Sequence, residues 1–170
     1  MKMYPCRVCK NIVAVEAEIC PHCGAKKPAN HLYDGTGIDY KSSIELFGYP
    51  LIHIAFGKDR NGHLRVAKGI IAIGQFGIGL ITFAQFGIGI LFGFGQFIVG
   101  ITAIAQVAIT LLFGIGQLAT GYITIGQIVI GYYGLAQAGF AKYIWTAKYK
   151  DPEAVIFFTQ LKEYLLRFLG

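Results

Sequence analysis

The chain has 170 residues, of which 55% are hydrophobic and only 14% are charged, with 23 glycines and a formal net charge of +6. So apolar a composition excludes a disordered chain, and it departs from that of an average soluble domain. The length allows one main core and a small appendage. Contact with a membrane therefore has to be considered from the outset.

Four cysteines stand in two pairs near the start, Cys6 with Cys9 and Cys20 with Cys23. Two thiolates separated by two residues can hold one ion from a single turn, and two such turns complete the tetrahedral shell of Zn(II). The first ten residues lack an apolar segment long enough for a secretion signal, so we expect a protein of the cytoplasmic side with reduced cysteines. Because cysteine fills all four positions, no site remains for a catalytic water, and the predicted zinc is structural.

This segment resembles the zinc-ribbon family found at the N-termini of many bacterial proteins, and residues 1–27 are predicted to form that domain. The resemblance implies that the four cysteines are the ligands, without His22. Zinc ribbons also bind nucleic acids, and Arg7, Lys10, Lys26 and Lys27 would supply phosphate contacts. The small number of charges and the missing aromatic platform disfavour that role.

Residues 28–43 are rich in Pro, Asn, Asp, Gly and Ser, which predicts a linker. From 44 to 68 the pattern becomes that of strands with a hairpin turn at 58–62, and we expect a cap for the edge of the repeats that follow. His53 and His63 have no cysteine, carboxylate or serine at a useful spacing. They are expected to face solvent or to pack against the cap.

Residues 69–147 form a repeat in which small and large apolar residues recur every five positions, and no charged residue occurs from Gly69 to Ala141. Extra residues at Phe92 and Phe113 interrupt the units, which predicts four units and one corner residue, about 21 residues, per coil. The predicted fold is therefore mainly β: a four-sided β-solenoid.

The tract resembles the pentapeptide-repeat family, whose quadrilateral β-helix places one small and one large residue inward in every five, in units such as Gly74-Gln75-Phe76. In that arrangement Gly74 and Phe76 point inward. A set of large residues then points outward as a candidate apolar contact surface: Ile73, Ile78, Phe83, Ile88, Phe94 and Ile104. In the alternative arrangement Phe76 and Ile78 both point inward.

Seven glutamines recur in the tract and are predicted to form two structural ladders on opposite walls. One ladder contains Gln75, Gln96, Gln117 and Gln137, and the other contains Gln85, Gln106 and Gln127. Amides stacked at strand spacing can hydrogen-bond along such a ladder.

Three transmembrane helices are the main rival, since the uncharged tract could supply three spans of about 20 residues. A step of five residues advances a helix by about 500°, so a five-residue pattern serves no helical face. Glycine at alternate positions also weakens a helix. After the repeats, residues 151–169 begin with Asp151 and Pro152 and are predicted to form an amphipathic helix that closes the last coil or lies on a bilayer.

No nucleophile with its base, phosphate-binding loop or carboxylate pair is visible, so enzyme activity is not expected. The predicted function is a non-enzymatic scaffold. A zinc ribbon that docks to a protein partner is joined to an apolar solenoid that associates with membrane lipid or with copies of itself, and basic residues flank the solenoid. Two alternatives stay open: a polytopic α-helical channel or transporter subunit, and nucleic-acid binding through the ribbon.

Overall fold

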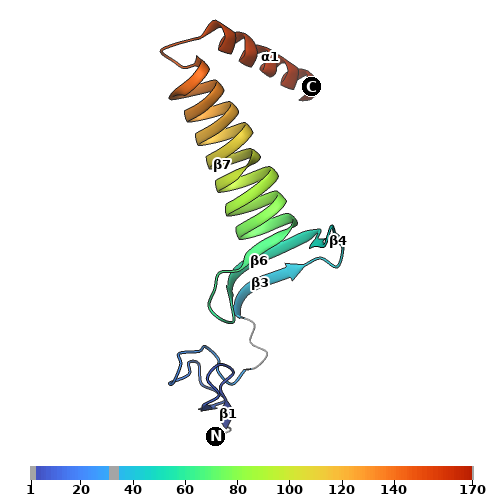
Figure 1. Cartoon of the computed structure of the whole chain (residues 1–170), viewed down its shortest axis with the longest axis vertical. Coiled ribbons are helices and arrows are strands. Elements are labelled where there is room, and N and C mark those ends of the chain that lie inside the picture. The colour runs from blue at the N-terminus through green and yellow to red at the C-terminus, as the bar shows by residue number, and fades with distance from the viewer. Residues whose placement is uncertain (1–2, 31–34, 170) are drawn as a thin grey trace. The chain divides into compact units, whose positions relative to one another are not determined.

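The computed structural model describes residues 3–30 and 35–169, with side chains up to Phe168 (Figure 1). Part of the predicted linker, residues 31–34, lies outside the described residues. The chain divides into two compact units, Met1–Gly37 with Gly57–Leu64, and Ile38–Phe56 with Arg65–Gly170.

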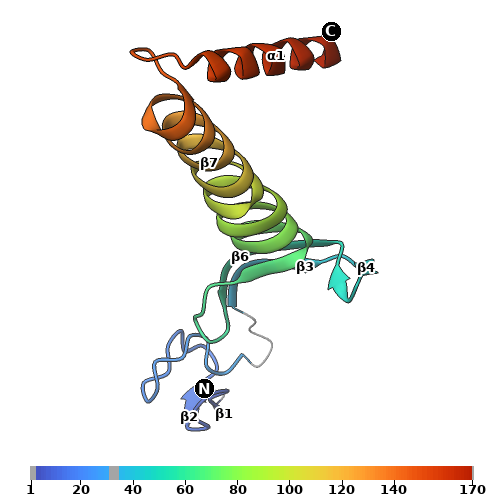
Figure 2. The same ribbon diagram turned by 45° about the horizontal axis from the view of Figure 1, so that its top comes forward.

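The first unit contains a short antiparallel strand pair, β1 (Met3–Pro5) with β2 (Ile12–Ala14), in which Tyr4 lies opposite Val13 (Figure 2). Val13 is buried together with Cys6 and Cys20, so a small core forms beside the cysteines. In the second segment of this unit, the Asp59 carboxylate accepts hydrogen bonds from the N–H groups of Asn61 and His63. These bonds fix the turn that the sequence predicted at 58–62.

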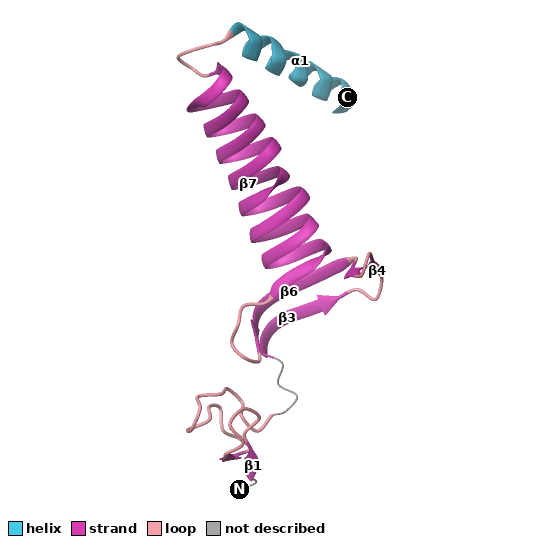
Figure 3. Ribbon diagram, in the orientation of Figure 1, coloured by secondary structure: helices cyan, strands magenta, loops and turns pink. Residues whose placement is uncertain are grey.

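The second unit is built on one very long strand. β7 (Val66–Trp145) joins β3 (Gly35–Lys41) and β6 (Ile52–Asp59) in a sheet of order β3-β6-β7, and β6 runs parallel to β7 with Ile52 opposite Ile71. β4 (Glu45–Leu46) and β5 (Tyr49–Pro50) form a small hairpin, and α1 (Pro152–Leu169) follows (Figure 3). The predicted mainly β class with a C-terminal helix is confirmed. β3 occupies residues assigned to the linker, and the β4–β5 hairpin interrupts the strand expected after residue 44.

The charge-free tract lies inside β7 and is therefore extended, not helical. Among the described residues, no helix is both long and apolar enough to cross a membrane.

β7 winds as one continuous coil that leads from β6 to α1 (Figure 1). Residues in contact between successive turns are separated by 10 or 11 positions, as in the hydrogen bonds from Thr110 to Thr120 and from Thr102 to Leu91. The rings of Phe76 and Phe86 stack with centroids 5.7 Å apart, close to the spacing of neighbouring strands. The predicted turn of 21 residues is thus wrong by a factor of about two, and the four-sided form is not established.

The inside of the coil is filled by small side chains. In each five-residue unit the first and third residues point inward, and nearly all of them are Gly, Ala or Thr; Ala72, Ala103 and Ala119 are fully buried. So short a turn leaves no room for two opposed large side chains. Both arrangements considered from sequence are therefore wrong about Phe76, which stacks in an outer column with the exposed Phe86 and Phe97.

The large and the polar side chains inside the coil are each accommodated by their neighbours. Ile98 is fully buried, and it fits because glycine stands opposite: a Cβ on Gly93 would lie 2.3 Å from the Ile98 Cγ2 atom. The buried Thr82 hydroxyl donates a hydrogen bond of 2.8 Å to the Ile88 carbonyl, and Thr124 donates to Tyr133. Polar groups inside the narrow core are satisfied in this way.

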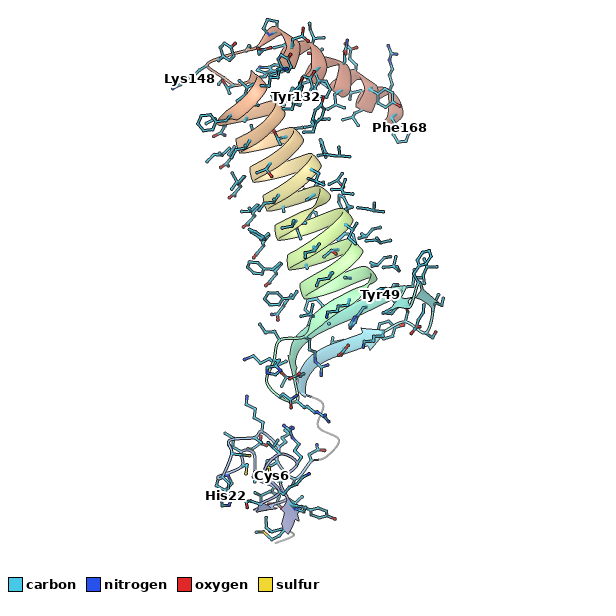
Figure 4. The ribbon with its side chains drawn as sticks, in the orientation of Figure 1. Cys6, His22, Tyr49, Tyr132, Lys148 and Phe168 are labelled. Atoms are coloured by element: carbon cyan, nitrogen blue, oxygen red, sulfur yellow. The ribbon has the colours of Figure 1, made fainter. Side chains whose placement is uncertain are left out.

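α1 closes the last turns of the coil. The Phe157 ring stacks on Tyr133 with centroids 4.2 Å apart, and Ala154 and Phe158 are buried. Tyr132, labelled in Figure 4, stacks on Tyr122 from the preceding turn. The second half of α1 leaves Leu165, Leu166 and Phe168 exposed, so only the first half acts as a cap.

A buried polar network orders the start of the coil. His53 on β6 is 5% exposed and lies 2.9 Å from an Asp39 carboxylate oxygen on β3, while Arg65 donates to the other oxygen. The Lys68 N–H donates to His53 Nδ1 at 2.8 Å, so His53 donates through Nε2 to Asp39. The sequence places no carboxylate at a useful spacing from His53, but the fold brings Asp39 of β3 next to it. His63 is 80% exposed by its side chain and faces solvent, as expected.

Replacing Ala103 by Phe should unfold the coil, whereas replacing its neighbour Ile104 by Phe should be tolerated. Ala103 is fully buried and Ile104 is 37% exposed, so the same ring enters a filled core in one variant and solvent in the other. We expect a loss of at least about 3 kcal/mol for Ala103→Phe and less than about 1 kcal/mol for Ile104→Phe, measured by urea unfolding. Equal effects would contradict the inward and outward assignment.

Replacing Asp39 by Asn should destabilise the second unit by about 2 kcal/mol near neutral pH, because buried donors on His53 and Arg65 lose a charged acceptor. Burial alone raises the pKa of Asp39, but the hydrogen bonds from His53 and Arg65 outweigh it and hold that pKa below its ordinary value. The stabilisation by the carboxylate is therefore present above the ordinary pKa of about 3.9 and is lost as pH falls through the lower, folded-state pKa.

The measurement is urea unfolding of both proteins at neutral pH and near pH 3, with a chelator present throughout. The difference between Asp39→Asn and the unsubstituted protein should shrink at the lower pH. A difference that stays constant with pH would show that the ionised carboxylate does not hold the network.

Candidate metal centre and apolar surface

The two cysteine pairs lie on two turns with the same backbone pattern. The N–H of Cys6 donates to the carbonyl of Asn11, and the N–H of Cys20 donates to that of Ala25. The carbonyl of each of these cysteines also accepts a hydrogen bond from the residue four positions later, Lys10 or Gly24, and both of these residues have positive φ. Glycine adopts this conformation without strain, as the sequence suggested for Gly24.

The four sulfur atoms lie at the corners of a site sized for one metal ion. Cys6 Sγ is 3.8 Å from Cys23 Sγ, Cys9 Sγ is 3.7 Å from Cys20 Sγ, and all four atoms fall within 4.8 Å of one another. A tetrahedral ion with metal–sulfur bonds of about 2.3 Å would place its sulfur ligands about 3.8 Å apart. The distances are too long for disulfides, and all four cysteines are free. The cluster is therefore compatible with metal binding.

The backbone around the cluster favours a thiolate on Cys6. Burial raises the pKa of Cys6, but backbone N–H groups, including that of Val8 at 3.4 Å from the sulfur, lower that pKa to about 6. For Cys23 the N–H of Ala25 lowers the pKa, whereas burial and the three neighbouring cysteines raise it to about 12. The cluster thus resists carrying four negative charges unless a cation compensates them.

His22 is exposed and does not belong to the ligand cluster. The four ligands are all cysteine, so the set leaves no open coordination position of the kind that a hydrolytic metal needs. The centre fits a structural ion better than a catalytic one.

A cleft of about 480 Å³ in the first unit is lined by several basic residues: Arg7, Lys26, Lys58 and Arg60. Arg7 donates to the carbonyls of Lys26 and Arg60, so part of its guanidinium serves to hold the two segments of this unit together.

The candidate apolar surface falls into two columns because the turn is short. Ile73, Phe83, Phe94 and Ile104 stand above one another in successive turns, with the Phe83 and Phe94 rings 6.4 Å apart. Ile78 and Ile88 belong to a second column, half a turn away, which continues through Val99 and Ile109. Ile73 is half-buried and the other five candidates are exposed. We call these two columns the apolar wall.

The glutamines align on one edge of the coil, because their separations match a turn of 10 or 11 residues. Gln75 is half-buried and the other six are exposed: Gln85, Gln96, Gln106, Gln117, Gln127 and Gln137. The short turn therefore merges the two predicted ladders on opposite walls into a single column. This column is a polar stripe on an otherwise apolar coil.

A comparison with family models, with curated proteins and with solved structures found no match to this chain. The resemblances to zinc ribbons and to pentapeptide repeats therefore rest on the residues themselves.

The geometry of the four sulfur atoms predicts one metal ion per chain, held by the cysteines alone. We expect Cys20→Ser to lower the bound metal to well below half an equivalent, since Cys20 is a buried ligand, and His22→Ala to leave it unchanged. Elemental analysis of the purified full-length variants measures this directly. A loss of metal in His22→Ala would contradict the ligand set.

Proposed function

We propose that this protein is a non-enzymatic, membrane-associated scaffold on the cytoplasmic side. In this proposal the cysteine cluster holds a structural Zn(II) ion and forms a module that docks to a protein partner. The β-solenoid formed by β7 associates with a lipid bilayer, whose lipids contact both columns of the apolar wall. The apolar wall is the observation that carries the proposal.

The wall is unusual because the residues that would normally fill a core are on the outside. Phe94 is 50% exposed, Ile88 is 46% exposed and Phe83 is 42% exposed, whereas nearly all of the inward positions hold Gly, Ala or Thr. Columns of this kind exceed the scattered apolar residues of an ordinary surface and call for lipid or protein contact. Successive turns of the coil pair with each other, so lipid contact along the wall would leave few backbone groups unsatisfied.

Charge favours lipid as the occupant of the wall. Lys142, Lys148 and Lys150 follow the uncharged tract closely, and Lys68 precedes it. Basic residues next to an apolar block attract anionic headgroups by about 1 kcal/mol each. The exposed Leu165, Leu166 and Phe168 on α1 add an amphipathic helix near one end of the coil.

Zinc is proposed as the metal because a set of four cysteines with paired spacing is the ligand set of closed, structural zinc sites. Such a site supplies folding free energy to a segment too small to bury a core of its own.

Flotation with vesicles of phosphatidylcholine and phosphatidylglycerol tests the proposal. Phe94→Glu should weaken binding by about 10-fold, because it removes one large side chain from the lipid contact. Gln96→Glu adds the same charge two residues away in the polar column and should bind like the unsubstituted protein. If the intact protein remains a monomer and does not float with the vesicles, the proposed function is wrong. If it forms an oligomer and does not float with the vesicles, the apolar wall is assigned to self-association instead of lipid binding.

A further inference from the structure

An apolar groove runs beside the β4–β5 hairpin and borders the second column of the apolar wall at Ile78. It has a volume of about 460 Å³, and its lining includes Phe47, Tyr49, Lys68, Ile70, Leu80 and Ile90. Tyr49 lies beside the first turns of β7 (Figure 4). A second groove of about 330 Å³ is lined by Ile90, Ile101 and Leu111, among others. The two grooves meet at Ile90 and form one trough.

The length of the trough follows from the repeat. Ile70, Leu80, Ile90, Ile101 and Leu111 occupy the same corner in five successive turns. Four steps at the strand spacing give a trough of about 19 Å. One leaflet of a bilayer has a hydrocarbon thickness of about 15 Å, half of the core. The trough is therefore long enough for one acyl chain.

The charge on the trough lies at one end. Lys68 is the only charged residue among those that line the two described grooves, and no carboxylate lines either of them. Its backbone is held in place by the hydrogen bond from its N–H to the buried His53. An apolar trough with a single cation at its end is complementary to an anionic headgroup that carries an acyl chain.

The tip of the hairpin adds a second, independent observation. Phe47 has a φ of +54°, a conformation that glycine or asparagine normally adopts in a two-residue hairpin turn. Its side chain is 85% exposed. A large apolar residue held in a strained turn and left in water is costly in the free protein. Residues in such conformations gather at ligand clamps.

We propose that this trough binds one acyl chain of an anionic phospholipid, with the headgroup at Lys68 and with Phe47 and Tyr49 against the chain. The inference rests on the proposed membrane association and names the lipid that it selects. It also gives the hairpin a role that the wall alone does not supply.

Tryptophan quenching by brominated lipids tests the inference on the full-length protein. Trp145 is the one tryptophan of the chain, so Trp145→Phe provides a background free of tryptophan. Ile90→Trp places a reporter in the trough, and Ile128→Trp places a matched reporter in the outer column that contains Phe76, Phe86 and Phe97. These two positions are 49% and 52% exposed. Circular dichroism checks that both reporters keep the strand content.

Vesicles contain phosphatidylcholine and phosphatidylglycerol, with bromine on the acyl chains of one lipid or of the other. We expect the reporter at position 90 to be quenched about 5-fold more effectively by brominated phosphatidylglycerol than by brominated phosphatidylcholine, as one lysine contact would give. The reporter at position 128 should show no preference. Lys68→Ala should abolish the preference at position 90, and Lys148→Ala should preserve it.

The outcomes separate the two proposals. If the protein floats with vesicles but both reporters respond alike, or if Lys148→Ala acts like Lys68→Ala, the trough is not selective and this inference is overturned while membrane association stands. Failure to float overturns both. Light scattering that reports a dimer, with neither reporter quenched, would assign the trough to a second copy of the chain and would also overturn the inference.

Discussion

The close approach of successive turns in β7 is the constraint on which the rest of the second unit depends. A turn of 10 or 11 residues encloses so little space that nearly all of its inward positions hold Gly, Ala or Thr. Most large side chains of each unit therefore point outward. The coil thus inverts the usual arrangement, with small residues inside and Ile, Leu and Phe outside. Both the apolar wall and the trough follow from this inversion.

A coil of this kind needs protection at its two ends, where backbone groups of the outer turns would otherwise lack partners. At the beginning, β6 pairs with the first turn of β7, and the network of Asp39, His53 and Arg65 fixes that pairing. At the other end, Tyr133 stacks on Phe157 of α1. The two caps differ in chemistry: one is polar and buried, and the other is aromatic.

The first unit is stabilised differently, because it is too small for a hydrophobic core of ordinary size. Its buried side chains are few, with Val13 beside Cys6 and Cys20. Backbone hydrogen bonds shape the two cysteine turns, and burial and the neighbouring cysteines raise the pKa of Cys23, so a cation bound by the four sulfur atoms would favour the thiolate form. Its free energy of folding is thus expected to depend on metal, whereas that of the coil depends on the packing of its small inward side chains.

The sequence by itself determined the four cysteines of the candidate metal site, the extended conformation of the tract and the C-terminal helix, because these depend on local spacing: two residues between paired cysteines, a five-residue period, and a cap with proline. It could not determine the length of a turn, since one turn of 21 residues and two of about 10 produce the same pattern along the chain. Only the tertiary structure decided that Phe76 lies outside and that the glutamines share one edge. It also brought Asp39 to His53 and Lys68 to the hairpin, because such contacts depend on which strands pair across the sequence.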